Sequence, residues 1–160
     1  MLNTLSILAV GATLASRASA VGNARVVNNC SFNVTAWSVG SDVSAPQTLS
    51  TGGSYGEPFA LDPKTGGRAL KITIDQDGLY TSKPQTVFAY SLQDNKVWYD
   101  LSDVFGDAFS GHTLVEASSD GNCPSIVWRN GIPPAGSQVK TCGAGANVTL
   151  TLCTEKLQKF

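Results

Sequence analysis

Three aspartates lie close together in the middle of the chain, at Asp100, Asp103 and Asp107. Two carboxyl groups on either side of a groove can hydrolyse a glycosidic bond, one as the acid and the other as base or nucleophile. A segment rich in Asp, Ser and Gly is equally typical of a solvated turn. We favour the turn, and keep Asp100 with Asp103 or Asp107 as the candidate catalytic pair.

Two large aromatic residues, Trp98 and Tyr99, directly precede Asp100. Such side chains can anchor a core or form a flat platform for sugar rings. Neighbouring residues of a strand point to opposite faces, so one of the two must face away from the core. We expect a ligand surface made of Trp98 or Tyr99 with Asp100 and Asp103, and place Trp37 in the core.

Other chemistries find little support. His112 is the only histidine and no serine lies in a Gly-x-Ser-x-Gly motif, which argues against a catalytic triad. The four cysteines include no Cys-x-x-Cys pair, and the closest two are eleven residues apart. We therefore expect neither a metal nor a cofactor.

The first twenty residues have the pattern of a signal peptide. An apolar run from Leu5 to Ala15 is followed by the small residues Ala18-Ser19-Ala20, and this run is too short to span a bilayer. Removal of residues 1–20 leaves 140 of the 160 residues, enough for one domain over 21–160. We predict a secreted monomer, extracellular or associated with the cell wall, without membrane insertion.

Charge excludes two classes of partner. Residues 21–160 hold ten basic and twelve acidic side chains, and no cluster of Lys or Arg. Nucleic acid and anionic membranes both require such clusters. We expect neither as a partner.

Short alternating segments separated by Gly, Pro, Ser and Asp predict an all-β sandwich or barrel, and no window has sustained helical periodicity. Residues 25–40 form a predicted strand pair around Asn28-Asn29. Phe88, Tyr90 and Leu92 alternate before Asp94-Asn95, which predicts a hairpin with residues 97–102. Shorter strands are expected at 113–116 and 125–128.

Four cysteines behind a signal peptide indicate two disulfides, with three possible connectivities. The simplest closure joins the terminal strands through Cys30 and Cys153, which leaves Cys123 with Cys142. In a regular strand, Cys153 would lie on the same face as Asn147, six residues earlier, and Asn147 should face solvent. A bulge or an edge position is therefore expected near Cys153.

Three glycosylation sequons begin at Asn29, Asn33 and Asn147. We rank Asn33 and Asn147 above Asn29, because Asn29 precedes a cysteine that is expected in a disulfide.

Three segments resemble the thaumatin-like superfamily: Val27-Asn28-Asn29-Cys30, the stretch Tyr90-Ser91-Leu92 with Trp98 to Gly106, and Leu150-Thr151-Leu152-Cys153. In length and cysteine count the chain resembles the small secreted fungal proteins of the Blastomyces yeast-phase-specific family. The resemblance implies a single thaumatin-like antiparallel β-sandwich domain with two disulfides, and it supports the Cys30–Cys153 pair.

Larger thaumatin-like proteins have an acidic cleft to which glucan binding and weak glucanase activity are attributed. At positions that resemble that cleft, this chain has Ile72 for an arginine, Ala89 for a glutamate and Phe105 for an aspartate, and only Asp100 is kept. One carboxyl cannot supply the two-carboxyl mechanism.

We therefore expect a non-catalytic module that acts at a fungal wall or host surface by binding carbohydrate, such as cell-wall glucan, or a host surface protein. One alternative is a weak endo-β-1,3-glucanase that uses Asp100. Another is an effector or toxin recognised by a host protein.

Overall fold

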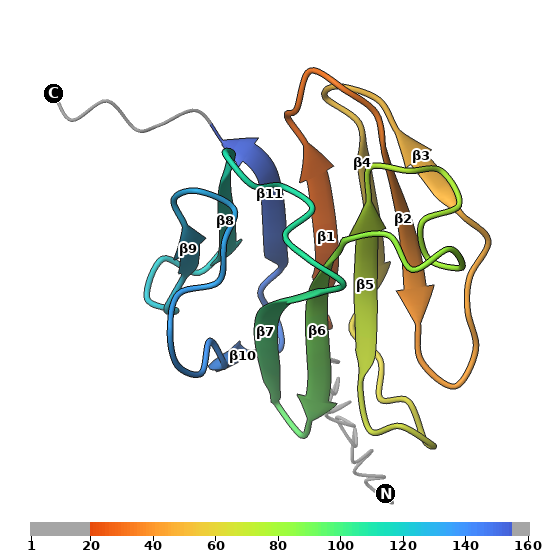
Figure 1. The fold of residues 1–160 in the computed structure, drawn as a ribbon. Coiled ribbons are helices and arrows are strands. Elements are labelled where there is room, and N and C mark those ends of the chain that lie inside the picture. Colours follow the sequence, from red (N-terminus) through yellow and green to blue (C-terminus); the bar gives the residue numbers. More distant parts are fainter. Residues whose placement is uncertain (1–19, 155–160) are drawn as a thin grey trace, which may run out of the picture.

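The computed structural model describes residues 20–154, and over these residues eleven strands form two sheets that pack face to face (Figure 1). The five-stranded sheet has the order β4-β1-β11-β8-β9. Its strands are β4 (Ser54–Pro58), β1 (Asn23–Asn28), β11 (Val148–Thr154), β8 (Thr113–Ser118) and β9 (Ile126–Trp128).

The six-stranded sheet has the order β10-β7-β6-β5-β2-β3. Its strands are β10 (Lys140–Gly143), β7 (Lys96–Val104), β6 (Gln85–Gln93), β5 (Arg68–Thr73), β2 (Val34–Val39) and β3 (Gln47–Leu49). The structure confirms the predicted all-β sandwich and the strands expected near residues 113 and 125.

Alternation within the strands builds the core between the two sheets. Leu70 and Ile72 of β5, Phe88 of β6 and Leu101 of β7 are fully or almost fully buried there. They meet Leu150 and other apolar residues of the five-stranded sheet. Each strand thus presents its alternate positions, such as Ala69 and Lys71, to the outer face of the sheet.

The β6–β7 hairpin is confirmed, and it provides the backbone of the functional surface. Gln93 pairs with Lys96 across Asp94-Asn95, and the register continues without a break to the Gln85–Val104 pair. Because no bulge interrupts it, the face occupied by every side chain of β7 follows from its parity.

Residues 25–40 do form two strands, but they do not pair with each other. β1 lies in the five-stranded sheet and β2 in the six-stranded one. The buried Asn28 side chain holds the crossover: its amide donates to the carbonyls of Phe32 and Leu49, both at 2.9 Å, and its Oδ1 accepts from the Cys30 N–H. Asn28 is thus a corner between sheets rather than a hairpin turn.

Both predicted disulfides form, Cys30–Cys153 and Cys123–Cys142. The first closes the parallel pair of β1 and β11, the terminal strands of the described chain. The expected bulge is also present, because the register of β11 with β8 shifts between Thr151 and Thr154 and Cys153 has a φ of 53°. That shift turns Cys153 toward Cys30.

Part of the outer face of the six-stranded sheet is covered. Trp37 is buried, yet it lies on the outer face because it alternates with the core residue Ala36. The segment after β5 packs on this face, where a Cβ on Gly78 would lie 2.7 Å from Thr73. Within residues 20–154, no segment covers the rest of that face, over β5, β6 and β7.

The predicted signal peptide lies outside the described residues except for Ala20. Over residues 20–154 no helix is long and apolar enough to cross a membrane. Asn29 and Asn33 are exposed, whereas the Asn147 side chain accepts hydrogen bonds from the backbone and side-chain nitrogens of Asn23.

Candidate functional site

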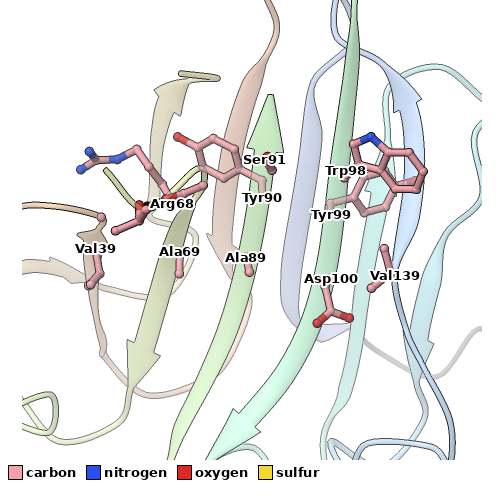
Figure 2. Close-up of a pocket in the computed structure, with 13 residues that line it drawn as sticks. Val39, Arg68, Ala69, Ala89, Tyr90, Ser91, Trp98, Tyr99, Asp100 and Val139 are labelled. Atoms are coloured by element: carbon pink, nitrogen blue, oxygen red, sulfur yellow. Dashed lines mark hydrogen bonds between the residues drawn. The ribbon is translucent and has the colours of Figure 1, made fainter. Parts of the chain in front are cut away.

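A groove of about 460 Å³ crosses the open part of the six-stranded sheet (Figure 2). Its lining is mostly apolar, and its residues come from β2, β5, β6 and β7, from the loops after β2 and before β5, and from the segment before β10. They are Val39, Gly40, Thr65, Gly67, Arg68, Ala69, Ala89, Tyr90, Ser91, Trp98, Tyr99, Asp100 and Val139.

Sheet register brings the floor together. Val39 is opposite Ala69, Ala69 is opposite Ala89, and Ala89 is opposite Asp100, so one row crosses four strands. The two alanines in the middle of the row are small, and the larger Val39 lies at one end (Figure 2). The surface of the sheet is hollow at this point because the two central side chains of the row are only methyl groups.

Trp98 is the exposed aromatic of the predicted pair. Its side chain is 41% exposed and lies on the same face as Ala89 and Asp100, opposite Ser91. Tyr99 is only 1% exposed, and its hydroxyl donates to the carbonyl of Pro124 beyond the core. The ring of Tyr99 therefore belongs to the core, and Trp98 alone of the two can offer its face to a ligand.

Asp100 lies at the edge of the groove next to Val139 (Figure 2). Its half-buried position raises its pKa, and a backbone hydrogen bond from Leu101 acts in the opposite direction. Among residues 20–154, no side chain donates a hydrogen bond to its carboxylate or forms an ion pair with it. The carboxylate is free to meet a ligand.

Asp103 projects from the other face of β7, since it lies three residues further along an unbroken strand. Its Oδ1 accepts a hydrogen bond of 2.6 Å from Thr86, the residue directly opposite in β6. Burial raises the pKa of Asp103 to about 7, the Thr86 hydroxyl lowers it, and a hydrogen bond with the exposed Asp107 raises it.

The three aspartates are therefore not gathered on one wall of the groove. Asp100 and Asp103 both border a smaller hollow of about 320 Å³ beside the 133–138 loop, but their side chains leave opposite faces of β7. Phe105, in a turn after β7 with a φ of 62°, is 62% exposed and is not part of the groove. The apolar character of the groove comes from Val39, Ala69, Ala89 and Val139 instead.

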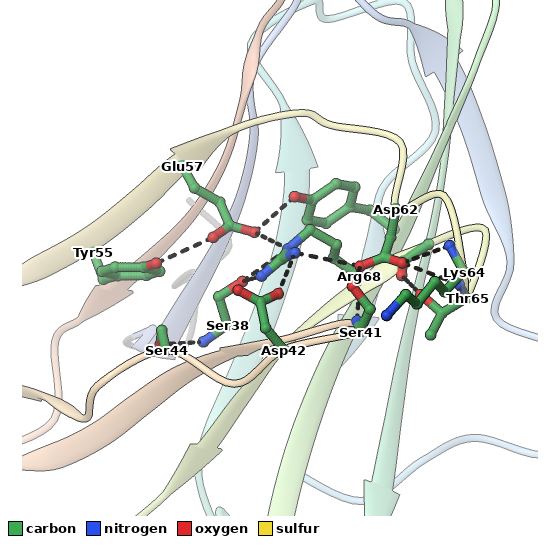
Figure 3. Close-up of polar contacts among 12 residues, drawn as sticks. Ser38, Ser41, Asp42, Ser44, Tyr55, Glu57, Asp62, Lys64, Thr65 and Arg68 are labelled. Carbon is green, nitrogen blue, oxygen red and sulfur yellow. Dashed lines mark hydrogen bonds and ion pairs between the residues drawn. The ribbon is translucent and has the colours of Figure 1, made fainter.

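A cluster of charged and hydroxyl side chains adjoins the groove at Arg68; we call it the polar corner (Figure 3). Arg68 forms ion pairs with Asp42 at 3.0 Å, Asp62 at 3.5 Å and Glu57 at 3.6 Å. The Ser38 hydroxyl accepts from two of its nitrogens at 3.1 and 3.0 Å. Arg68, the one cation among residues 20–154 that lines the groove, is thus neutralised by carboxylates outside it.

Asp62 is the most fully hydrogen-bonded acid of this corner. It accepts from the backbone N–H groups of Ser41, Lys64 and Thr65 and from the Ser41 hydroxyl, at 2.7 to 3.0 Å. These bonds hold its pKa well below the usual range. Gly40 is required beside it, because a Cβ there would lie 2.5 Å from an Asp62 oxygen.

Glu57 connects the two sheets. It comes from β4 of the five-stranded sheet and accepts a hydrogen bond of 2.6 Å from Tyr90 of β6 and one of 3.1 Å from Tyr55. Burial and the Glu57 carboxylate raise the pKa of Tyr90 well above its usual value. The polar corner is therefore a structural joint that closes one end of the sandwich.

Sequence reasoning missed the polar corner and most of the groove. Glu57, Asp62 and Arg68 lie on separate segments and form no motif. Ala89 and Asp100 are the two cleft positions of the resemblance that do line the groove. The two-residue connection at Asp94-Asn95 fixes the hairpin register and places Ala89 opposite Asp100.

One trio of possible metal ligands gathers among the described residues, Asp120, Cys123 and Cys142. The two cysteines form a disulfide, so neither offers a thiolate.

The two packed sheets, with a disulfide joining the first and last strands, define a thaumatin-like β-sandwich. The fold is similar to the protein elicitor MoHrip2 from Magnaporthe oryzae, with a TM-score of 0.68 and 24% identity over 83% of this chain and 99% of that one. It is also similar to the thaumatin-like xylanase inhibitor TLXI, with a TM-score of 0.58 and 13% identity over 82% of this chain and 99% of that one.

The chain belongs to the Bys1 family, described as Blastomyces yeast-phase-specific protein, whose model matches residues 11–154. It is 29% identical over 129 residues to the antigenic thaumatin-like protein of Arthroderma benhamiae, covering 80% of this chain and 64% of that relative. It is 28% identical over 170 residues to the secreted thaumatin-like protein calA of Emericella nidulans, covering 92% and 96%. The chain is thus a secreted thaumatin-like protein of fungal type.

Proposed function

We propose that the protein is a non-catalytic module that binds a carbohydrate outside the cell, at a fungal wall or a host surface. The observation that carries this proposal is the exposed Trp98 beside a flat, apolar floor of small residues.

The chemistry of the groove suits a sugar ring. A pyranose has an apolar C–H face that stacks on an indole, and its edge carries hydroxyl groups that need a few polar partners. Trp98 offers the platform and Asp100 a free acceptor on the same face of β7. The volume of about 460 Å³ lies within the range of small-ligand sites.

The placement of the carboxyls supports binding rather than hydrolysis. Hydrolysis of a glycoside requires two carboxyls on either side of the scissile bond. Among the described residues, Asp100 is the only carboxyl that lines the groove, because Asp103 leaves the opposite face of β7 and accepts a hydrogen bond from Thr86.

The test is a sedimentation assay with insoluble β-1,3-glucan and chitin, backed by a glycan array. We expect Trp98→Ala to weaken binding at least tenfold and Asp100→Asn to weaken it less, with no release of reducing ends by the wild type. The glucanase alternative would replace this proposal if β-1,3-glucan were hydrolysed, Asp100→Asn abolished that activity and Trp98→Ala left it intact.

Protein recognition remains a second candidate, and two side chains favour it. Tyr80 and Phe105 are 71% and 62% exposed, and neither lines the groove. If a host surface protein is the partner, we expect the double variant Tyr80→Ser, Phe105→Ser to lose capture of that protein while Trp98→Ala keeps it. The opposite result would assign the interaction to the groove.

A further inference from the structure

The groove places an acceptor and a small apolar surface side by side. Ala89 and Asp100 are directly opposite in the β6–β7 register, on the outer face of the sheet. Their Cβ atoms are therefore about 5 Å apart, as in any directly opposed pair. Ala69 continues the apolar surface on the next strand, opposite Ala89.

The other polar groups around this point are already engaged. The Ser91 hydroxyl donates to the Gly66 carbonyl at 2.7 Å, and the Thr65 hydroxyl donates to the Gly67 carbonyl at 2.6 Å. Arg68 is held by the carboxylates of the polar corner. Among the described residues that line the groove, Asp100 is thus the charged side chain left without a partner.

This distribution of charge selects the kind of ligand. The positive charge of Arg68 is neutralised, so it offers little attraction to a sulfated, phosphorylated or uronic acid ligand. The unpaired Asp100 carboxylate would repel such groups. An uncharged ligand fits, provided that it brings a hydrogen-bond donor for Asp100 and an apolar group for the alanines.

We propose that the ligand is an oligosaccharide of N-acetylated hexosamines, an inference that rests on the proposed function of the groove. The sugar ring stacks on Trp98, the acetamido N–H donates to the Asp100 carboxylate, and the acetyl methyl contacts Ala89 and Ala69. Trp98 and Asp100 are two residues apart on one strand, a rise of about 7 Å. That separation matches a pyranose ring with an acetamido substituent at its edge.

A glucan without acetamido groups would use only part of this site. Its hydroxyls could donate to Asp100, but it has no methyl group for Ala89 and Ala69. Those two residues would then stay in contact with water, which loses the apolar contribution to affinity.

The experiment uses Trp98 as the reporter. Trp37 and Trp128 are buried and Trp98 is exposed, so a ligand in the groove should shift the emission of Trp98 most. The intact secreted protein is titrated with chitohexaose, cellohexaose and laminarihexaose. We expect chitohexaose to bind at least tenfold more tightly than cellohexaose, which has the same linkage and lacks only the acetamido groups.

Variants then assign the preference. Asp100→Leu should reduce the ratio of chitohexaose to cellohexaose affinity to about one, and Trp98→Phe should retain the ratio when binding is measured by calorimetry. Ser102→Ala, two residues beyond Asp100 on the same face and outside the groove lining, is the matched control and should bind as the wild type does. Thermal melting confirms that each variant is folded.

The outcomes separate the two proposals. Equal affinity for chitohexaose and cellohexaose, with both lost in Trp98→Ala, would overturn the acetamido inference and leave the groove as a carbohydrate site. A preference that survives Asp100→Leu would also overturn it. Absence of binding by all three oligosaccharides would contradict the carbohydrate function itself, and the inference with it.

Discussion

The polar corner and the groove are adjacent and share Arg68, yet they treat charge in opposite ways (Figures 2 and 3). In the polar corner, Arg68 meets three carboxylates, and Asp62 accepts four hydrogen bonds from Ser41, Lys64 and Thr65. In the groove, the Asp100 carboxylate has no side-chain partner among the described residues. The charged groups that join the two sheets are paired with one another, whereas the Asp100 carboxylate in the groove is unpaired and accessible to a ligand.

The difference separates a structural region from a functional one. A buried ion pair that loses one member leaves the other charge unpaired, so the polar corner should be sensitive to single replacements. The floor of the groove is made by side chains on the outer face of an already paired sheet, so replacement of Trp98 or Asp100 there should affect binding more than folding.

The largest effect is expected for Arg68→Met. It removes the cation and leaves Glu57 and Asp62 without their ion pair, which should lower the free energy of unfolding by about 3 kcal/mol, near the lower end for a broken buried pair because Arg68 is partly exposed. Urea unfolding at pH 7 measures the change. Lys71→Met, on the same strand and without an ion pair in the described residues, is the control. A loss below about 1 kcal/mol would show that the corner does not join the sheets.

Among residues 20–154, Glu116 of β8 is a second carboxylate without a partner, but it faces the core instead of the groove. No described residue donates a hydrogen bond to either of its carboxylate oxygens. Burial raises its pKa well above the usual value, and the nearby charge of Asp100 adds to this. At a pH between the unfolded and folded pKa values of Glu116, its carboxyl is therefore protonated in the folded state and ionised in the unfolded state. The associated stability is complete below the usual glutamate pKa of 4.5, which applies to the unfolded state, and is lost as the pH rises through the folded pKa.

We expect Glu116→Gln to remove this loss. The amide cannot ionise, so the variant should be more stable than the wild type at pH 8 and similar to it at pH 4. Tyr99, whose pKa is raised by burial and by Glu116, is a second titratable neighbour in the other sheet, beside Asp100. Urea unfolding at pH 4, 6 and 8 gives the comparison, and parallel pH profiles for the two proteins would refute the assignment.

A smaller effect of the same sign is expected for Asp103, which is only partly buried and keeps the Thr86 hydrogen bond. Its pKa of about 7 implies a contribution that is complete below about pH 4 and is lost as the pH rises through 7. Asp103→Asn should flatten the stability profile between pH 5 and 8. Asp107→Asn, which removes the neighbouring carboxyl, should shift the midpoint of the wild-type profile to lower pH.

Features of the fold and the groove that depend on residues close together in the sequence could be predicted, and those that depend on distant segments could not. Period-two alternation predicted the β6–β7 hairpin, and the parity of Cys153 predicted the bulge near it, because both depend on local geometry. That Asp100 and Asp103 leave opposite faces of β7 could have been deduced from their spacing of three residues.

Other features depend on contacts between distant segments. The choice of Trp98 over Tyr99 as the exposed aromatic follows from which face of β7 meets the other sheet. The separation of β1 and β2 into two sheets depends on Asn28 contacting Leu49. The polar corner needs Glu57, Asp62 and Arg68 to meet across both sheets, and no local pattern indicates such a meeting.

The smallest change in stability is expected for Trp98→Ala, although its effect on binding should be large. Trp98 is 41% exposed on the outer face and lies outside the core between the sheets, so its loss should change the free energy of unfolding by no more than about 1 kcal/mol. Urea unfolding together with sedimentation on polysaccharide separates the two effects. If Trp98→Ala destabilised the protein as much as Arg68→Met does, Trp98 would be part of the packing that holds the sheet. Trp98 would then have a structural role, as Arg68 does, and the distinction between a ligand-binding groove and a structural polar corner would be wrong.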